Sequence, residues 1–288
     1  MGDAQRKARF HGGVMRRNSF SVLRVRSAAG RPQRLLVRDL TRAPQLPGAT
    51  SAATTYADPI AARAALDGVH TLFMVSAFES PTRVAEHRTF IDAAVAAGVQ
   101  HIVYTSFCGA AEDAVFTHAR DHWHTEQHLR AQQEHGVGWT FLRDNFYADF
   151  MPELVGPDDV LRGPAADGRV APVAQDDIAA AAAAVLTDPA PHAGRTYNLT
   201  GPDSLTLSEI AIILGQTTGR DITYRPQTLD EARASRTDGQ TPDWLIDAWI
   251  STYTAIAAGE VATVTQDIAH LSGKPPTGLA ELLRRNRS

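Results

Sequence analysis

An arginine and an aspartate stand where a short apolar run ends, near residue 38. The run Leu-Leu-Val at 35–37 is typical of a buried parallel strand, and Arg38 and Asp39 follow it directly. In a nucleotide-binding α/β sheet, an acid at the end of the second strand binds the ribose 2′-OH of NAD, whereas an arginine accommodates the 2′-phosphate of NADP. Because the arginine comes first, this strand end favours NADP(H) as the cofactor. The alternative is an arginine that is simply solvated.

A second apolar strand ends on two hydroxyl side chains. The segment 99–106 (VQHIVYTS) closes on Thr105 and Ser106, at the edge of a parallel sheet where ligands are expected. On the helix that follows, His118 and His122 are four residues apart, so both imidazoles lie on one face. Imidazole is the side chain most often used for proton transfer.

The histidines of this helix also raise the question of a metal site. Pairs spaced i, i+4 can chelate zinc, but in His-Thr-Glu-Gln-His at 124–128 the glutamate takes the middle position, unlike the metalloprotease motif. No set of cysteines or carboxylates completes a site, so we expect no metal and a polar helix with histidines on several faces. Five histidines lie within 18 residues: His118, His122, His124, His128 and His135.

Alternating strands and helices must position these residues. From residue 34 onward the alternation predicts βαβ units with right-handed crossovers. We therefore expect an α/β fold, a Rossmann-like doubly wound parallel sheet with a smaller mixed α/β C-terminal part. The expected strands are 34–38, 52–56, 69–76, 99–106 and 137–142, and the expected helices are 59–66, 82–97 and 115–135.

After about residue 150, prolines and glycines become frequent and the pattern changes. This predicts three parts: a basic leader (1–33), an NAD(P)-binding part (34–150) and a mainly helical substrate-side part (151–288). The tryptophans Trp244 and Trp249 are predicted to lie in the core or on a homodimer face. The expected strands are 169–174, 196–199 and 222–225, and the expected helices are 176–187 (capped by Asp176 and Asp177), 207–218 (after Ser204 and Thr206), 229–235 and 242–257.

Composition limits the environment and the partners. The single cysteine, Cys108, rules out a disulfide framework and favours the reducing cytoplasm, and nothing near it predicts a reactive thiol. No run approaches 18 apolar residues, so we expect no membrane span. Residues 1–34 carry nine basic groups and one acid, whereas the remainder carries 19 basic groups and 31 acids. An acidic body of this kind is not expected to bind nucleic acid.

The basic leader allows three interpretations. It is Arg-rich, contains Ser and has few acids, as a transit peptide has. The second interpretation is that the leader is a basic arm that binds an acidic partner. The third interpretation, which we favour, is a segment translated out of frame, because no strand, Gly-rich turn and helix can be recognised before Arg34.

From residue 34 to about 285 the chain resembles the NmrA-like branch of the atypical short-chain dehydrogenase/reductases. Within that branch it is most similar to the type 2 NAD(P)H:quinone oxidoreductases. No single motif is decisive, but the ordered set is specific. The motifs are Leu36-Val37-Arg38-Asp39, 65–69 (ALDGV), His87-Arg88, 91–94 (IDAA), 97–99 (AGV), Tyr104-Thr105-Ser106, Thr125-Glu126, 142–147 (LRDNFY), 197–201 (YNLTG) and 273–277 (GKPPT).

The resemblance implies roles for residues at the strand ends. Ordinary short-chain dehydrogenases pair a serine with Tyr-x-x-x-Lys, which this chain lacks. By resemblance, Ser106 and His122 are the catalytic candidates, with His122 relaying a proton. The implied cofactor contacts, besides Arg38, are Ser76, Ala77, Phe78 and Thr105, then Asn145, Phe146 and Tyr147 in a loop bordering nicotinamide and substrate. The alternatives are a core or lid aromatic for Phe78, a plain polar helix residue for His122, and simple loop packing for 145–147.

The resemblance fails over 1–33, where the family carries a Gly-x-x-Gly-x-x-Gly turn. Gly12-Gly13 is not that motif. Such a turn provides the main pyrophosphate site, and the roughly 1.5–3 kcal/mol of a charge-assisted contact from Arg38 does not replace it. The alternating segment 20–26 is a candidate for the missing first strand of the sheet.

These observations favour an NAD(P)H-dependent oxidoreductase that transfers hydride from NADPH to a quinone or similar small planar carbonyl compound. Quinones need less acid catalysis than ketones because the hydroquinone anion is stable, so the missing Tyr-Lys pair does not count against them. One alternative is a non-catalytic NADP-binding redox sensor of the NmrA type. Another is a product of a frame-shifted gene that is defective in cofactor binding.

Overall fold

A four-stranded parallel sheet forms the centre of the molecule, in the order β3-β4-β5-β8. The computed structural model describes residues 32–286, so nearly all of the leader 1–33, including the candidate strand 20–26, lies outside the described residues. The parallel ladders confirm the expected α/β class. The strands are β3 (Thr71–Met74), β4 (His101–Phe107), β5 (Gly138–Asp144) and β8 (Arg195–Leu199).

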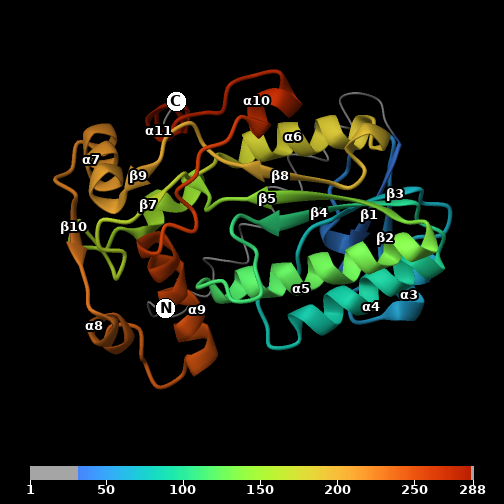
Figure 1. Cartoon of the computed structure of the whole chain (residues 1–288), viewed down its shortest axis with the longest axis horizontal. Helices are drawn as coiled ribbons and strands as arrows, with labels where there is room; N and C mark the ends of the chain where they lie inside the picture. Colours follow the sequence, from blue (N-terminus) through green and yellow to red (C-terminus); the bar gives the residue numbers. More distant parts are fainter. Residues whose placement is uncertain (1–31, 287–288) are drawn as a thin grey trace.

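Helices cover both faces of this sheet, as a doubly wound fold requires (Figure 1). Side chains of β4 alternate between the faces: Ile102 and Tyr104 pack with Phe90 of α4 and Leu129 of α5, whereas Val103 packs with Ile178 of α6. None of the helices in the described part is long and apolar enough to cross a membrane. On one face lie α3 (Pro59–Ala65), α4 (Arg83–Ala96) and α5 (Thr117–Ala131); on the other lie α6 (Gln175–Thr187) and α10 (Asp267–Ser272).

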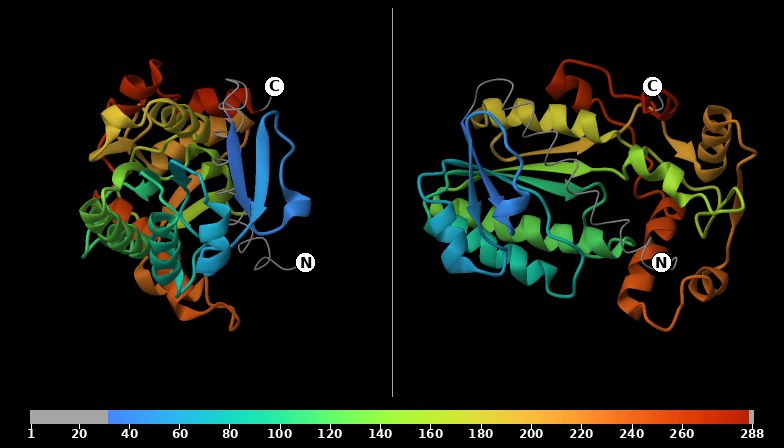
Figure 2. Two further views of the ribbon diagram at one scale, coloured as in Figure 1. Left: turned by 90° about the vertical axis from the view of Figure 1, so that its right-hand side faces the viewer. Right: turned by 180° about the vertical axis from the view of Figure 1, so that it is seen from behind.

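The strands β1 (Gln33–Val37) and β2 (Ala49–Ala53) form a separate parallel pair. Figure 2 shows this pair at one side of the molecule, with its strands running across the direction of β4 and β5. Among residues 32–286, no ladder joins it to β3. Two side chains attach the segment to the body: Arg34 donates to the carbonyl oxygens of Ala65 (3.0 Å) and Asp67 (2.7 Å), and Tyr56 donates to that of Val75 (2.6 Å).

Apart from α6, β8 and α10, which belong to the central sheet and its cover, the C-terminal part lies beyond the carboxyl ends of β4 and β5 (Figure 1). It is mixed α/β, as expected, and its core includes Leu207 and Ile210 of α7 together with Phe107 at the end of β4. Its elements are β6 (Val160–Gly163), β7 (Arg169–Val170), β9 (Leu205–Thr206), α7 (Leu207–Thr218), β10 (Thr223–Pro226), α8 (Leu229–Ala234), α9 (Asp243–Ala257) and α11 (Leu279–Arg285), with β6 pairing β10 and β7 pairing β9.

Two local expectations in this part are wrong. The predicted strand 169–174 is only two residues long, because Pro172 lacks an N–H and the N–H groups of Ala171 and Val173 donate to Val261 and Phe146 instead. The predicted Asp caps of α6 are also absent: Ala174 is the N-cap, and Asp177 accepts from the backbone and hydroxyl of Thr277. The expected cap at Thr206 is present as a capping box with Glu209.

Candidate active site

Buried side chains hold the backbone that follows β3. The N–H of Ser76 donates to Oγ1 of Thr105 over 3.1 Å, which joins the ends of β3 and β4. The N–H of Ala77 donates to Nε2 of His87 (2.7 Å), and its carbonyl accepts from Nε of Arg83 (3.1 Å). The structure thus brings three of the predicted cofactor contacts, Ser76, Ala77 and Thr105, to one edge. Phe78 is 49% exposed, so it is not a core residue.

His87 has both ring nitrogens engaged. Its Nε2 accepts from Ala77, so Nδ1 carries the hydrogen and donates to Oγ1 of Thr125 over 2.8 Å, and that hydroxyl donates to the carbonyl of Asp121. Burial, helped by the charge of Arg83, holds the pKa of His87 well below its usual value. His87 is therefore a neutral support for the loop.

Arg83 is a buried cation, only 3% exposed, that links the loop to α5. Its guanidinium donates to Nε2 of His122 (3.0 Å) and approaches Oδ2 of Asp121 (3.4 Å). Because arginine only donates, His122 must carry its hydrogen on Nδ1, which donates to the hydroxyl of Tyr104 at 2.9 Å. Burial first and the charge of Arg83 second hold the pKa of His122 well below its usual value. In this structure His122 is thus neutral and has a partner at each nitrogen.

Ser106 belongs to a neighbouring network on the same face of the sheet. Its hydroxyl donates to Oε1 of Glu126 over 2.6 Å, and Glu126 also accepts two bonds from Arg143, at 2.8 and 2.7 Å, and one from Arg130. Glu126 is fully buried. A buried carboxylate needs such paired donors to offset its desolvation, so Ser106 stabilises this ion pair.

His118 sits between two carboxylates. Its Nε2 lies 3.3 Å from Oε1 of Glu79, in the loop after β3, and its Nδ1 lies 3.4 Å from Oδ2 of Asp121. Burial opposes a charge here, but the interactions with Asp121 and Glu79 outweigh it and raise the pKa of His118. His118 therefore differs from His87 and His122, because its pKa is raised whereas theirs are lowered.

Three phenylalanines gather where the sheet meets the C-terminal part. Phe107 at the end of β4 lies 4.8 Å from Phe116 and 4.9 Å from Phe146, measured between ring centroids. Phe116 and Phe146 are 5.3 Å apart. Phe107 and Phe116 are buried, and Phe146 is half-buried. A cluster of rings at the carboxyl edge of a parallel sheet suits a flat ligand.

The other predicted residues of the loop after β5 make structural contacts. Asn145 is buried; its amide donates to the carbonyl of Val261 (2.9 Å) and its Oδ1 accepts from the N–H of Phe146 (2.7 Å). The hydroxyl of Tyr147 donates to Asp144 over 3.1 Å. Burial raises the pKa of Asp144 to about 8, so its carboxyl is mostly protonated at neutral pH.

The side chains of Arg38 and Asp39 differ in their hydrogen-bond partners. Asp39 is used locally: its Oδ1 accepts from the hydroxyl and N–H of Thr41, and these bonds lower its pKa. Arg38 is exposed just after β1 and has no hydrogen bond or ion pair with another described residue. This contrast leaves the arginine, and not the acid, available to a ligand.

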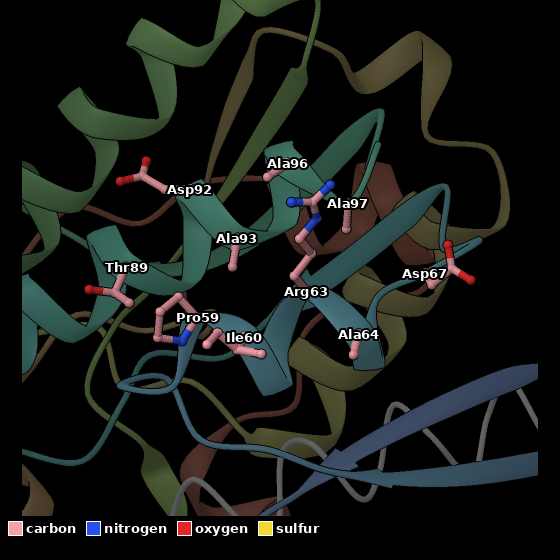
Figure 3. Close-up of a pocket in the computed structure, with 10 residues that line it drawn as sticks. All are labelled: Pro59, Ile60, Arg63, Ala64, Asp67, Thr89, Asp92, Ala93, Ala96 and Ala97. Atoms are coloured by element: carbon pink, nitrogen blue, oxygen red, sulfur yellow. The ribbon is translucent and has the colours of Figure 1, made fainter.

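Sequence reasoning missed Arg83, His87, Glu79 and Asp121 as parts of the site. Arg83 and His87 are four residues apart at the start of α4, directly after the loop, which was the signal available. A surface groove of about 990 Å³ between α3 and α4 shares none of these residues (Figure 3). Its lining residues include Ile60, Arg63 and Ala64 of α3 and Thr89, Ala93 and Ala96 of α4 (Figure 3).

Comparison with known proteins places the chain in a family. The model of the NmrA-like family matches residues 17–233. The chain is 32% identical to the NAD(P)H azoreductase of Xenophilus azovorans over 271 residues, covering 91% of this chain and 92% of the relative. It is 32% identical to quinone oxidoreductase 2 of Escherichia coli strain K12 over 237 residues, covering 81% of each.

A solved structure supports the same family assignment. The NADPH-dependent quinone oxidoreductase QOR2 of Escherichia coli, solved in complex with NADPH, superimposes with a TM-score of 0.85 at 29% identity, covering 96% of this chain and 98% of that one. The matched range and the coverage confirm the resemblance inferred from the motifs. They correct its expected start, because the family match begins at residue 17, within the leader 1–33 where no resemblance was expected. The chain belongs to the NmrA-like family.

Proposed function

We propose that this protein is an NAD(P)H-dependent oxidoreductase that reduces a quinone or a similar small planar acceptor, with NADPH as hydride donor. The observation that carries the proposal is the fixed backbone of Ser76 and Ala77, held by Thr105, His87 and Arg83 at the carboxyl edge of the sheet. Ligands of doubly wound sheets bind outside this edge.

The residues present fit a nicotinamide dinucleotide phosphate. Among the described residues none pairs with the guanidinium of Arg38, which suits a 2′-phosphate, while the carboxylate of Asp39 is occupied by its own turn. The chain would hold the rest of the cofactor through Ser76, Ala77, Phe78 and Thr105, and through the loop 145–147. When bound, the reduced nicotinamide supplies the hydride.

The acceptor is inferred from the aromatic cluster and from the relatives. Phe146 is half-buried and packs on the buried rings of Phe107 and Phe116, so it is the ring of this cluster that can contact a flat conjugated molecule. The relatives named above are a quinone oxidoreductase and an azoreductase, and quinones and azo compounds are both flat and conjugated. A quinone also needs less acid catalysis than a ketone, in keeping with the absence of a Tyr-x-x-x-Lys pair.

His122 and Ser106 support this site. His122 orients Arg83 and Tyr104 through its two nitrogens. Ser106 binds the buried carboxylate that neutralises Arg143. We propose that both act on the reaction by positioning other groups.

Titration of the purified chain with NADPH, followed by addition of a benzoquinone, tests the proposal. We expect binding, seen as a change in nicotinamide fluorescence, and then loss of the nicotinamide absorbance band. Binding without turnover over a panel of quinones and azo dyes would favour the redox sensor. No binding of either NADPH or NADH would favour the defective product.

A further inference from the structure

His118 carries a buried nitrogen that lacks a hydrogen-bond partner. The residue is 8% exposed, and its Nε2 is fully shielded from solvent. Glu79 lies 3.3 Å away, but Nε2 makes no aligned hydrogen bond to any described residue. Leaving a buried donor unsatisfied costs roughly 1–3 kcal/mol, and more for a charged group. A native site tolerates this cost when a ligand supplies the acceptor.

The neighbouring imidazoles do not share this property. Both nitrogens of His87 are bonded, to Ala77 and Thr125, and both nitrogens of His122 are bonded, to Arg83 and Tyr104. These partners fix the tautomer of each ring. The single N–H of each ring is therefore already used within the protein and is not available to a substrate. Of the three histidines, only His118 has a nitrogen without an aligned hydrogen bond, since the approach of its Nε2 to Glu79 is an ion-pair contact alone.

The position of His118 also suits contact with an acceptor. Its ring packs edge-on against Phe116 with centroids 5.4 Å apart, and Phe116 belongs to the aromatic cluster. Glu79, on its other side, comes from the loop that presents Ser76 and Ala77. His118 thus lies between the segment assigned to the cofactor and the rings assigned to the acceptor.

The charges around His118 favour a protonated ring. Glu79 from the loop and Asp121 from its own helix are the acids that face it. Arg83 of α4 opposes them, and His122 is neutral. Glu260 accepts from the N–H groups of Val115 and Phe116, just before His118 in the chain. Asp121 and Glu79 prevail, and they raise the pKa of His118.

We propose that His118 is the proton donor of this site and that its Nε2–H binds, and then protonates, the heteroatom of the acceptor; this rests on the proposed function. Reduction of a quinone adds one hydride with its electron pair and one proton to oxygen. The hydride comes from the reduced nicotinamide, and the proton comes from Nε2. His118 is left as neutral imidazole, and it regains a proton from solvent after the hydroquinone leaves.

The test compares two acceptors, of which only the first needs a proton. A quinone needs hydride and proton, whereas a cationic triarylmethane dye becomes neutral on taking hydride alone. General acids contribute about 10²–10⁴-fold, and the stable hydroquinone anion places quinones at the lower end. We expect His118→Gln to lower kcat with a benzoquinone about 10²-fold and to leave kcat with the dye within about twofold. His124→Gln, on the same helix, is the matched control.

A second variant covers the case that His118→Gln does not fold. Glu79→Gln keeps the imidazole but removes one of the carboxylates that hold its proton. NMR titration of the His118 ring in the cofactor-free protein should show a lower pKa in this variant than in the wild type. The alkaline limb of the quinone kcat profile, which falls as His118 loses its proton, should move to lower pH by the same amount.

Several outcomes separate this assignment from the proposed function. A wild-type protein that reduces no acceptor contradicts the proposed function. A wild-type protein that reduces quinone while His118→Gln keeps its kcat and pH profile overturns the assignment of His118 alone. Equal losses with quinone and dye, or a His118 pKa and kcat profile unchanged by Glu79→Gln, also overturn it.

Discussion

The guanidinium of Arg83 donates to Nε2 of His122 over 3.0 Å, and this contact decides where the histidine carries its hydrogen. The same guanidinium binds the carbonyl of Ala77, so one buried cation joins the loop after β3 to the helix α5. Arg83 therefore connects the segment assigned to the cofactor with the segment assigned to the acceptor.

Loss of this cation should destabilise the fold. Arg83→Gln leaves the carbonyl of Ala77 and Nε2 of His122 short of a donor, and each unsatisfied buried group costs roughly 1–3 kcal/mol. We expect the free energy of unfolding in urea to fall by about 3 kcal/mol. Arg88→Gln, on the exposed side of the same helix, should change it by less than about 0.5 kcal/mol. Equal effects of the two substitutions would contradict the role given to Arg83.

Arg38 should set the preference for NADPH over NADH. A charge-assisted contact worth roughly 1.5–3 kcal/mol corresponds to a factor of about 10–150 in affinity. Arg38→Ala should lower the affinity for NADPH by that factor and leave the affinity for NADH unchanged, as measured by nicotinamide fluorescence. Arg63→Ala, an exposed arginine on α3, is the control. If Arg38→Ala lowers the affinity for both cofactors equally, the arginine does not bind the 2′-phosphate.

The hydroxyl of Thr105 should contribute more to NADPH binding and to thermal stability than its methyl group does. Thr105→Val leaves the buried N–H of Ser76 without an acceptor, at a cost of roughly 1–3 kcal/mol, whereas Thr105→Ser keeps it satisfied. We expect weaker NADPH binding and a lower Tm in the valine variant, and smaller changes in the serine variant. Indistinguishable variants would show that the bond does not hold the loop.

Asp144 should make stability depend on pH. Its pKa rises from 3.8 to about 8 on folding, so the unfolded chain binds fewer protons between these values and stability falls as pH rises through this window. Asp144→Asn cannot ionise and keeps an acceptor for the hydroxyl of Tyr147. The difference in unfolding free energy between the variant and the wild type should grow by up to about 1.4 kcal/mol per pH unit between pH 4 and 8. Asp113→Asn, at an exposed position, should show no such trend.

The sequence predicts the sheet better than the site. Apolar runs such as 99–106 are long enough to specify buried strands, and Leu207–Thr218 is predicted residue for residue, with the capping residue Thr206 marking its start. Thr105 and Ser76 can be paired from sequence, because neighbouring parallel strands end at one edge. Arg83 and His87 cannot, because polar residues on a helix usually face solvent, and only the packing of α4 against α5 shows that these are buried.

The pairing of β1 and β2 shows a further limit of sequence reasoning. Their existence follows from local pattern, but their orientation across β3–β5 depends on contacts far along the chain, such as that of Arg34 with Ala65. Arg38 was placed correctly at a strand end. Its relation to Ser76 could not be read from the sequence, since it depends on how the two sheets sit beside each other.

Hydride transfer from the nicotinamide is the central claim, and rapid mixing of the NADPH-loaded chain with a benzoquinone tests it most directly. Single-turnover oxidation of NADPH should be faster than that of NADPH deuterated at the transferred position, because breaking the carbon–hydrogen bond is then part of the observed step. Oxidation at the rate of the reaction without protein, with NADPH shown to be bound, would contradict the claim.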